Sequence, residues 1–164
     1  MVGCSDTSLA IALGANLPHA GKEPRQTLLE VRPLLIALAT EWADAPLRFS
    51  WSPLFDTTPM GGPPSQPRYL NSVVVIRGCL GQPAQTAAIN LLDNLHSLER
   101  QFGRQRVAEQ LWGPRTLDLD LLFWGELRFE HMRLTLPHPR LHLRSFVLEP
   151  LLAAMKCSED WGTA

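Results

Sequence analysis

Residues 117–121 read Leu-Asp-Leu-Asp-Leu, and this strict alternation restricts the fold more than any other segment of the chain. On a β-strand successive side chains point to opposite faces of the sheet, so the leucines share one face and Asp118 and Asp120 share the other. We therefore predict a strand over residues 117–124, with a leucine face in the core and two carboxylates close together on the opposite face.

The carboxylate pair needs a partner, because two like charges at this distance repel each other. Water, a basic neighbour or a divalent cation can each relieve the repulsion. Mg²⁺ commonly uses one or two carboxylates and completes its octahedron with water and substrate phosphates. An ordinary amphipathic strand with a hydrated polar face would show the same pattern, and for two alternating aspartates alone it is the more frequent explanation.

The basic residues near the pair favour the metal site. Of the 15 Lys and Arg residues, 13 are Arg, and eight of these lie within residues 100–144. Planar guanidinium groups suit two-pronged contacts with phosphate or carboxylate, although a genome rich in arginine codons would also raise their number. Arg104, Arg106 and Arg115 precede the aspartates, the last within residues 112–115 (Trp-Gly-Pro-Arg). A metal on one side and guanidinium groups on the other would hold a nucleoside triphosphate.

Length and composition indicate one globular domain over residues 1–164. That length is typical of a single domain, and 45% hydrophobic with 19% charged residues is ordinary for a globular protein. The net charge of −1 gives no basic field for nucleic acid, and no apolar run is long enough to span a membrane. The start of the chain shows no secretory signal, so we expect a cytoplasmic protein. Three widely spaced cysteines predict free thiols.

A bound triphosphate would have to be held without a glycine cradle. Residues 21–23 read Gly-Lys-Glu and lack the upstream glycine of a P-loop, and the glycine of residues 14–16 is too isolated for a dinucleotide fingerprint. Metal and arginine would then carry the phosphate contacts. His138, held in the stiff segment Pro-His-Pro-Arg at residues 137–140, is a further candidate, although a lone loop histidine is more often a surface residue.

Apolar periodicity and turn residues divide the chain into elements. Alternating and β-branched runs predict extended segments at residues 8–14, 47–57, 69–77 and 117–124. Helical spacing predicts helices from residue 24 to 38 and at residues 82–102 and 146–154. The first would carry an apolar stripe of Leu28, Leu29, Val31, Leu34, Leu35 and Leu38, and Pro33 inside this stripe should kink or divide the helix. Residues 58–67, with four prolines and two glycines, and residues 104–115 are expected loops. Without a repeated βαβ spacing, this order favours an α+β fold with an antiparallel or mixed sheet.

Tyr69 and Asn71 alternate onto one face of their strand beside the proline-glycine loop. An aromatic ring and an amide placed in this way could stack on a flat heterocycle and form hydrogen bonds with its edge. A strand tyrosine is more usually a packing residue, so this pair alone does not identify a ligand.

Taken together, these segments resemble the 6-hydroxymethyl-7,8-dihydropterin pyrophosphokinase family of folate biosynthesis. The matching segments, in order, are residues 12–17, 57–71, 104–122 and 136–151. The most specific are residues 112–120 (Trp-Gly-Pro-Arg-Thr-Leu-Asp-Leu-Asp) and 136–140 (Leu-Pro-His-Pro-Arg). The resemblance implies an α+β fold: a three-layer α/β/α sandwich, ferredoxin-like, with a central, largely antiparallel sheet.

The resemblance also implies an activity and a set of ligands. Members transfer the terminal pyrophosphoryl unit of ATP to the hydroxymethyl group of 6-hydroxymethyl-7,8-dihydropterin and release AMP. Two Mg²⁺ ions bridge the triphosphate and are held by the residues that match Asp118 and Asp120. We expect ATP as co-substrate, a monomer, and no nucleic-acid or membrane partner.

Individual roles carry over by position in the matched segments. Arg104 and Arg106 would close over ATP, and Trp112 would seal the site. The nucleotide and its phosphates would further contact Arg115, Glu99, His138 and Arg144. The pterin would lie between the rings of Tyr69 and Phe146, with Asn71 at its edge and Gly14 and Met60 completing the pocket.

Two other functions are compatible with parts of the pattern. A nucleotidyltransferase-like palm domain also carries paired aspartates on a sheet, but it would need a basic groove, which the net charge of −1 disfavours. A non-catalytic ferredoxin-like regulatory module would have no need to keep Asp118, Asp120 and the loop arginines together. Release of AMP from ATP that depends on hydroxymethyldihydropterin separates the three functions.

Overall fold

The computed structural model describes residues 7–59, 61–106 and 113–159, with side chains up to residue 156. One five-stranded sheet contains β1 (Thr7–Ala15), β2 (Leu47–Trp51), β3 (Phe55–Thr57), β4 (Tyr69–Gly78) and β5 (Asp118–Trp124). The strand order is β2-β4-β1-β5, with β3 also paired to β4, and every pairing is antiparallel. The helices are α1 (Pro24–Ala43), α2 (Gln85–Gln101) and α3 (Ser145–Glu159).

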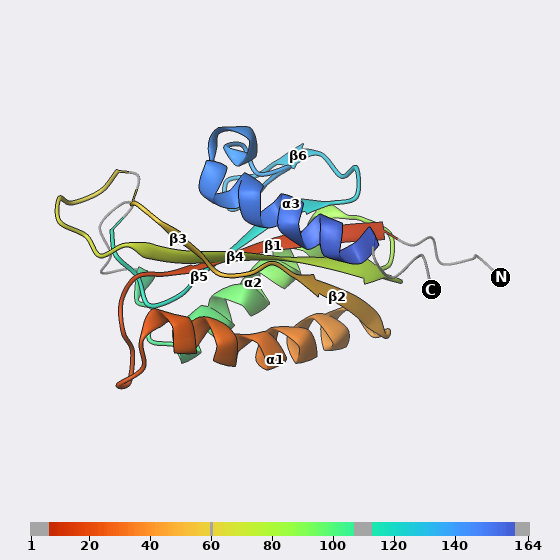
Figure 1. Cartoon of the computed structure of the whole chain (residues 1–164). Coiled ribbons are helices and arrows are strands. Elements are labelled where there is room, and N and C mark those ends of the chain that lie inside the picture. Colours follow the sequence, from red (N-terminus) through yellow and green to blue (C-terminus); the bar gives the residue numbers. More distant parts are fainter. Residues whose placement is uncertain (1–6, 60, 107–112, 160–164) are drawn as a thin grey trace.

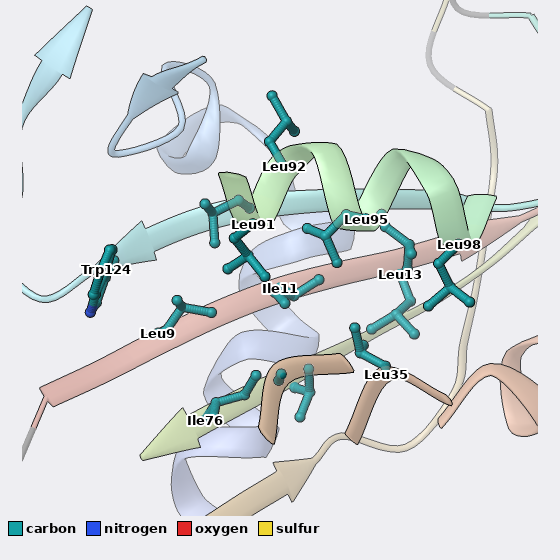
Figure 2. Close-up of a cluster of buried hydrophobic side chains, with 14 of the residues drawn as sticks. Leu9, Ile11, Leu13, Leu35, Ile76, Leu91, Leu92, Leu95, Leu98 and Trp124 are labelled. Atoms are coloured by element: carbon teal, nitrogen blue, oxygen red, sulfur yellow. The ribbon is translucent and has the colours of Figure 1, made fainter. Parts of the chain in front are cut away.

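The sheet lies between two helical layers, with α1 and α2 on one face and α3 on the other (Figure 1). This confirms the predicted ferredoxin-like α/β/α sandwich with an antiparallel sheet. A hydrophobic core lies on each face of the sheet, because successive side chains of β1 point to opposite faces. Leu9, Ile11 and Leu13 belong to the cluster that α1 and α2 cover, shown in Figure 2, whereas Ala10 belongs to the smaller cluster that includes Val147 of α3.

Helix α1 begins with Pro24 in its first turn and continues through Pro33 to Ala43, so the predicted division at Pro33 is wrong. Pro33 lies on the exposed side of the helix. The apolar stripe is also narrower than predicted. Leu28, Val31 and Leu35 are fully buried, but Leu29 and Leu34 are 42% and 44% exposed. At 100° per residue the last two lie beside the buried stripe rather than within it.

Helix α2 buries Leu91, Leu95 and Leu98 at helical spacing, and Glu99 next to them is buried as well. Gly103, with φ of +83°, follows the last turn and redirects the chain towards Arg104. The backbone amide of Arg104 donates a hydrogen bond to the Glu99 carbonyl at 3.1 Å. The end of this helix therefore brings a buried carboxylate and an arginine together.

Other boundaries differ from the predictions in detail. The extended segment 47–57 divides into β2 and β3 around Ser52, whose hydroxyl accepts a hydrogen bond from the Val73 amide at 2.9 Å. Helix α3 is longer than predicted. The hairpin of β6 (Phe129–Glu130) and β7 (Thr135–Leu136) and the 3₁₀ turn η2 (Leu141–Leu143) were not predicted, because elements of two or three residues have too few positions to show a period.

Cys79 is disulfide-bonded, so the prediction of free thiols is wrong at this position. The side chains of the other two cysteines lie outside the described part of the chain. Across the described ranges, no helix combines the length and the apolar character that a membrane span requires.

Candidate active site

The register of the sheet places three predicted site residues in one row. Gly14 at the end of β1 pairs with Asn71 of β4 on one side and with Asp118 of β5 on the other. Two residues along, Ala12 pairs with Asp120. The carboxylates share the face of the sheet that carries α3, while Leu117, Leu119 and Leu121 are buried on the opposite face. The predicted alternation of this strand is confirmed.

A hollow of about 520 Å³, open to solvent, lies over this row. Its lining includes Tyr69, Asn71, Arg115, Asp118, Arg144 and Phe146, all predicted site residues, together with Thr57, Thr58 and Pro59. Two aromatic rings, one amide and a charged rim give this hollow the chemistry of a site for a flat, polar heterocycle.

Gly14 provides the space beside Asn71. A Cβ at this position would lie 2.9 Å from Asn71 Oδ1, closer than real Cβ contacts. The Asn71 amide is itself held, because its Nδ2 donates to Thr57 Oγ1 at 2.5 Å. The edge of the hollow is therefore built from glycine, amide and hydroxyl in direct contact.

Asn16 connects this edge to the two neighbouring loops, a role that the sequence analysis did not assign to it. Asn16 is 2% exposed. Its Oδ1 accepts from the Arg115 amide at 2.8 Å, and its Nδ2 donates to the Pro67 carbonyl at 3.0 Å. Only its position directly after the strand, two residues beyond Gly14, could have indicated it. The hydroxyl of Tyr69 adds another link by donating to the Gly113 carbonyl at 3.1 Å.

Buried ion pairs join α2 to the start of β5. Arg104 Nη1 lies 2.5 Å from Glu99 Oε2 and 2.7 Å from Asp118 Oδ1, and it donates to the Leu117 carbonyl at 3.1 Å. The Arg104 side chain is only 3% exposed. Arg106, 41% exposed, pairs with Glu99 Oε1 at 2.7 Å. Of the two arginines expected to close over ATP, Arg104 is therefore inside the fold in this structure and Arg106 is at its surface.

The two aspartates have different electrostatic surroundings. Burial alone would raise the pKa of Asp118, but the charges of Arg104 and Arg115 outweigh it and hold that pKa below its usual range. Burial, followed by the charge of Asp118, raises the pKa of Asp120 to about 7. Asp118 Oδ1 lies 2.7 Å from Arg104 Nη1, and Asp118 Oδ2 lies 3.5 Å from Arg115 Nη1. By contrast, no described residue forms a hydrogen bond or ion pair with the side chain of Asp120.

This asymmetry fits a divalent cation. The described residues contain no group of three or more His, Cys, Asp or Glu side chains that could enclose a metal. Mg²⁺ needs no such group, since one or two carboxylates with water and phosphate complete its shell. A cation at the pair would stabilise the charged form of Asp120, which the protein alone does not.

A second open hollow, of about 730 Å³, lies beyond Asp120. Its lining includes His96, Arg106, Asp120 and His138, together with Leu121 and residues 131–135 of the β6–β7 hairpin. The His138 amide donates to the Leu122 carbonyl at 2.7 Å, which holds this loop against the edge strand β5. Burial, and then the charge of Arg144, lowers the pKa of His138.

His96 is a site residue that sequence reasoning missed. It lies one helical turn before Glu99, and its Nε2 is 3.9 Å from Glu99 Oε1. Burial, and then the charges of Arg106 and Arg104, lowers the pKa of His96 to about 4, so its imidazole is neutral near pH 7. The spacing of three residues to a helix carboxylate was the available signal. Two predicted site residues, Met60 and Trp112, lie outside the described part of the chain.

Comparisons with known proteins find a family and several relatives. A family model described as 7,8-dihydro-6-hydroxymethylpterin-pyrophosphokinase (HPPK) matches residues 10–156. Three relatives are named 2-amino-4-hydroxy-6-hydroxymethyldihydropteridine pyrophosphokinase. The one from Synechocystis sp. is 46% identical over 100 residues, 61% of this chain and 45% of that protein. Those from Pseudomonas aeruginosa and Haemophilus influenzae are 38% and 39% identical, each over 86% of this chain and over 76% and 77% of their own lengths.

Proposed function

The chain belongs to the 7,8-dihydro-6-hydroxymethylpterin-pyrophosphokinase family, whose activity is that of a pyrophosphokinase in folate biosynthesis, and we propose how its residues carry out the reaction. The diphosphate of ATP is transferred to the hydroxymethyl oxygen of 6-hydroxymethyl-7,8-dihydropterin, and AMP is released. The observation that carries the proposal is the row Asn71–Gly14–Asp118, which puts an aromatic-lined hollow directly beside the carboxylate pair.

The pterin occupies the first hollow. Tyr69 and Phe146 supply the two rings and Asn71 supplies an amide at the heterocycle edge. Phe146 lies under the Arg144 guanidinium, whose central carbon is 5.5 Å from the ring centroid, so the cation also orients this ring. A pterin held in this way would direct its hydroxymethyl group towards Asp118, at the boundary with the second hollow.

The nucleotide occupies the second hollow, with its phosphates reaching the carboxylate pair. Arg106 lines that hollow together with His138, and Arg115 and Arg144 line the first, so guanidinium groups line both hollows. The arginines supply charge that complements a triphosphate. We assign Met60 to the pterin pocket and Trp112 to closure over the nucleotide from the family resemblance alone.

Asp118 and Asp120 are the residues that would hold Mg²⁺, and we propose two ions. When bound, Mg²⁺ would supply neutralisation of the phosphate charge and polarisation of the phosphoryl oxygens. The chain itself contributes position: the hydroxymethyl oxygen is placed for in-line attack on the β-phosphorus of ATP. Positioning and electrostatic stabilisation supply most of the acceleration in phosphoryl transfer, and we propose no dedicated base.

We also propose a cytoplasmic monomer in which residues 1–164 form one catalytic domain. The support for one domain is that a single five-stranded sheet with its helices carries the residues that line both hollows. Light scattering during gel filtration measures this directly, and a stable dimer that loses activity on dilution would contradict it.

The function is tested by AMP release from ATP in the presence and absence of hydroxymethyldihydropterin. We expect release only when both substrates and Mg²⁺ are present. Asp118→Ala and Asp120→Ala should each lower kcat/KM by about a hundredfold or more, because each removes a metal ligand. Glu41→Gln, an exposed carboxylate on α1, is the control and should retain full activity. Near-normal turnover in either aspartate variant would contradict the assignment.

A further inference from the structure

Glu99 accepts more hydrogen bonds than any other described carboxylate of the site, and its side chain is only 1% exposed. Its Oε1 accepts from Arg106 Nε at 3.2 Å and from Arg106 Nη2 at 2.7 Å. Its Oε2 accepts from Arg104 Nη1 at 2.5 Å, from Arg106 Nη2 at 3.0 Å and from the Leu119 amide at 3.3 Å. A carboxylate has about four lone-pair sites, so these contacts occupy its hydrogen-bond acceptor positions.

A carboxylate in this state cannot also serve as a direct ligand of the nucleotide. It is buried, and its acceptor positions face arginine and backbone rather than either hollow. Burial raises the pKa of Glu99, against the charge of Arg104. Glu99 can therefore influence the reaction only through the groups that it holds, and this differs from the direct nucleotide contact that the family resemblance implies.

The contact with Leu119 has a specific geometric consequence. Strand β5 lies at the edge of the sheet, with β1 as its only neighbouring strand in the described structure, so some of its amides face away from the sheet. The Leu119 amide is one of these, and its residue separates Asp118 from Asp120. Fixing this amide fixes the backbone from which both carboxylates project.

The contacts with arginine act on the same pair from the other side. Arg104 lies between Glu99 Oε2 and Asp118 Oδ1, at 2.5 Å and 2.7 Å. A guanidinium that bridges two carboxylates in a buried site has one orientation, because its donors form a rigid fork. Glu99 thus holds Arg104 against Asp118 while it keeps Arg106 at the margin of the second hollow.

We propose that Glu99 is a positioning residue for the pyrophosphoryl transfer: its buried carboxylate holds the Leu119 amide, Arg104 and Arg106 so that the Asp118/Asp120 pair and the phosphate-facing arginine keep a defined geometry. The proposal rests on the proposed function for its kinetic consequence. Its structural consequence, an ordered backbone at Leu119, does not depend on any activity.

The first test is amide hydrogen exchange of the ligand-free protein, comparing Glu99→Gln with wild type and with the control Glu41→Gln. We expect the Leu119 amide to exchange about tenfold faster or more in Glu99→Gln, while the amides of β4, on the far side of β1, keep their protection. Unchanged protection at Leu119 would overturn the proposal. Uniform loss of protection across the sheet would show general destabilisation and would overturn it too.

The second test is equilibrium binding, with Mg²⁺ and a nonhydrolysable ATP analogue in one titration and hydroxymethyldihydropterin in another. In Glu99→Gln we expect analogue affinity and kcat to fall by about tenfold or more, with pterin affinity within about twofold of wild type. Equal losses for both ligands, or no loss of analogue affinity, would count against a positioning role.

Two further variants keep the proposal testable if Glu99→Gln folds poorly. Arg106→Gln changes a half-exposed side chain and should weaken analogue binding while Leu119 stays protected. Glu99→Asp retains the charge with a shorter reach and should recover part of the Leu119 protection; no recovery would contradict the argument from geometry. An inactive wild-type enzyme would refute the proposed function, yet the exchange experiment would still decide the role of Glu99.

Discussion

Asn16 and Arg115 hold each other through a reciprocal pair of hydrogen bonds. The backbone amide of Arg115 donates to Asn16 Oδ1 at 2.8 Å, and the backbone amide of Asn16 donates to the Arg115 carbonyl at 3.1 Å. The residues are 99 positions apart in the chain. Because Asn16 Nδ2 also reaches the Pro67 carbonyl, one buried amide ties the end of β1 to the loops on both sides of the first hollow.

Asn16→Ala should therefore weaken both the fold and the site. Removing the side chain takes away the hydrogen-bond partner of the Arg115 amide and of the Pro67 carbonyl, which should cost about 1–3 kcal/mol of unfolding free energy. We expect kcat/KM to fall for both substrates, since Arg115 lines the first hollow and its Nη1 lies 3.5 Å from Asp118 Oδ2, in the carboxylate pair proposed to face the phosphates. Urea unfolding and steady-state kinetics measure the two effects. Asn90→Ala, an exposed residue of α2, is the matched control, and an Asn16→Ala enzyme equal to it would refute the role of Asn16.

Gly14→Ala should act on pterin binding through Asn71. The added Cβ would lie 2.9 Å from Asn71 Oδ1, so the amide must move away from its place at the hollow. We expect pterin KM to rise by about tenfold, with a smaller change in ATP KM. In an Asn71→Ala background the same substitution should cost little more, because the clash is gone. Additive losses in the double variant would contradict this explanation.

Tyr69→Phe separates the ring of Tyr69 from its hydroxyl. The ring remains to stack in the hollow, while the hydrogen bond to the Gly113 carbonyl is lost. We expect pterin affinity within about twofold of wild type and a fall of about threefold to tenfold in kcat. Fluorescence titration of the pterin and single-turnover kinetics distinguish these effects. A loss confined to pterin affinity would show that the hydroxyl contacts the heterocycle instead of ordering the loop.

The raised pKa of Asp120 predicts a pH-dependent stability difference between wild type and Asp120→Asn. The pKa is about 7 in the folded protein against 3.8 for an ordinary aspartate. Between pH 3.8 and 7 Asp120 is protonated in the folded protein but ionised in the unfolded chain, so the stability of the folded protein falls as the pH rises towards and through 7. Asp120→Asn stays neutral and should be more stable at pH 8, by on the order of 2 kcal/mol after allowance for partial exposure, with the advantage shrinking towards pH 4.

Urea unfolding at several pH values without metal tests this prediction. The lowered pKa of His96 has the opposite effect, because stability is lost as pH falls from 6.5 to about 4, but it is common to both proteins and cancels in the difference. Adding Mg²⁺ with the nonhydrolysable analogue should remove the advantage of Asp120→Asn, since a cation favours the charged aspartate. A difference that is constant with pH would show that Asp120 is ionised throughout.

Several features followed from local patterns alone. The alternation of residues 117–121 predicted both the buried leucine face and the paired carboxylates, because a strand has a period of two whatever lies around it. Five further elements, β1, β4, α1, α2 and α3, were found from their apolar patterns. Leu29 and Leu34 were placed wrongly in the core, because a helix of 20 residues with many leucines does not by itself reveal how wide its buried stripe is.

The site was predictable in its residue types and less so in its connections. The amino-acid sequence by itself determined that Asp118 and Asp120 share a face and that arginines lie near them along the chain. Only the tertiary structure decided that Gly14 and Asn71 stand beside Asp118, that Arg104 is buried, and that Glu99 reaches the Leu119 amide. These contacts join residues on different strands and helices, so they depend on strand register and on how α2 packs against the sheet. Neither leaves a periodic signal in the sequence.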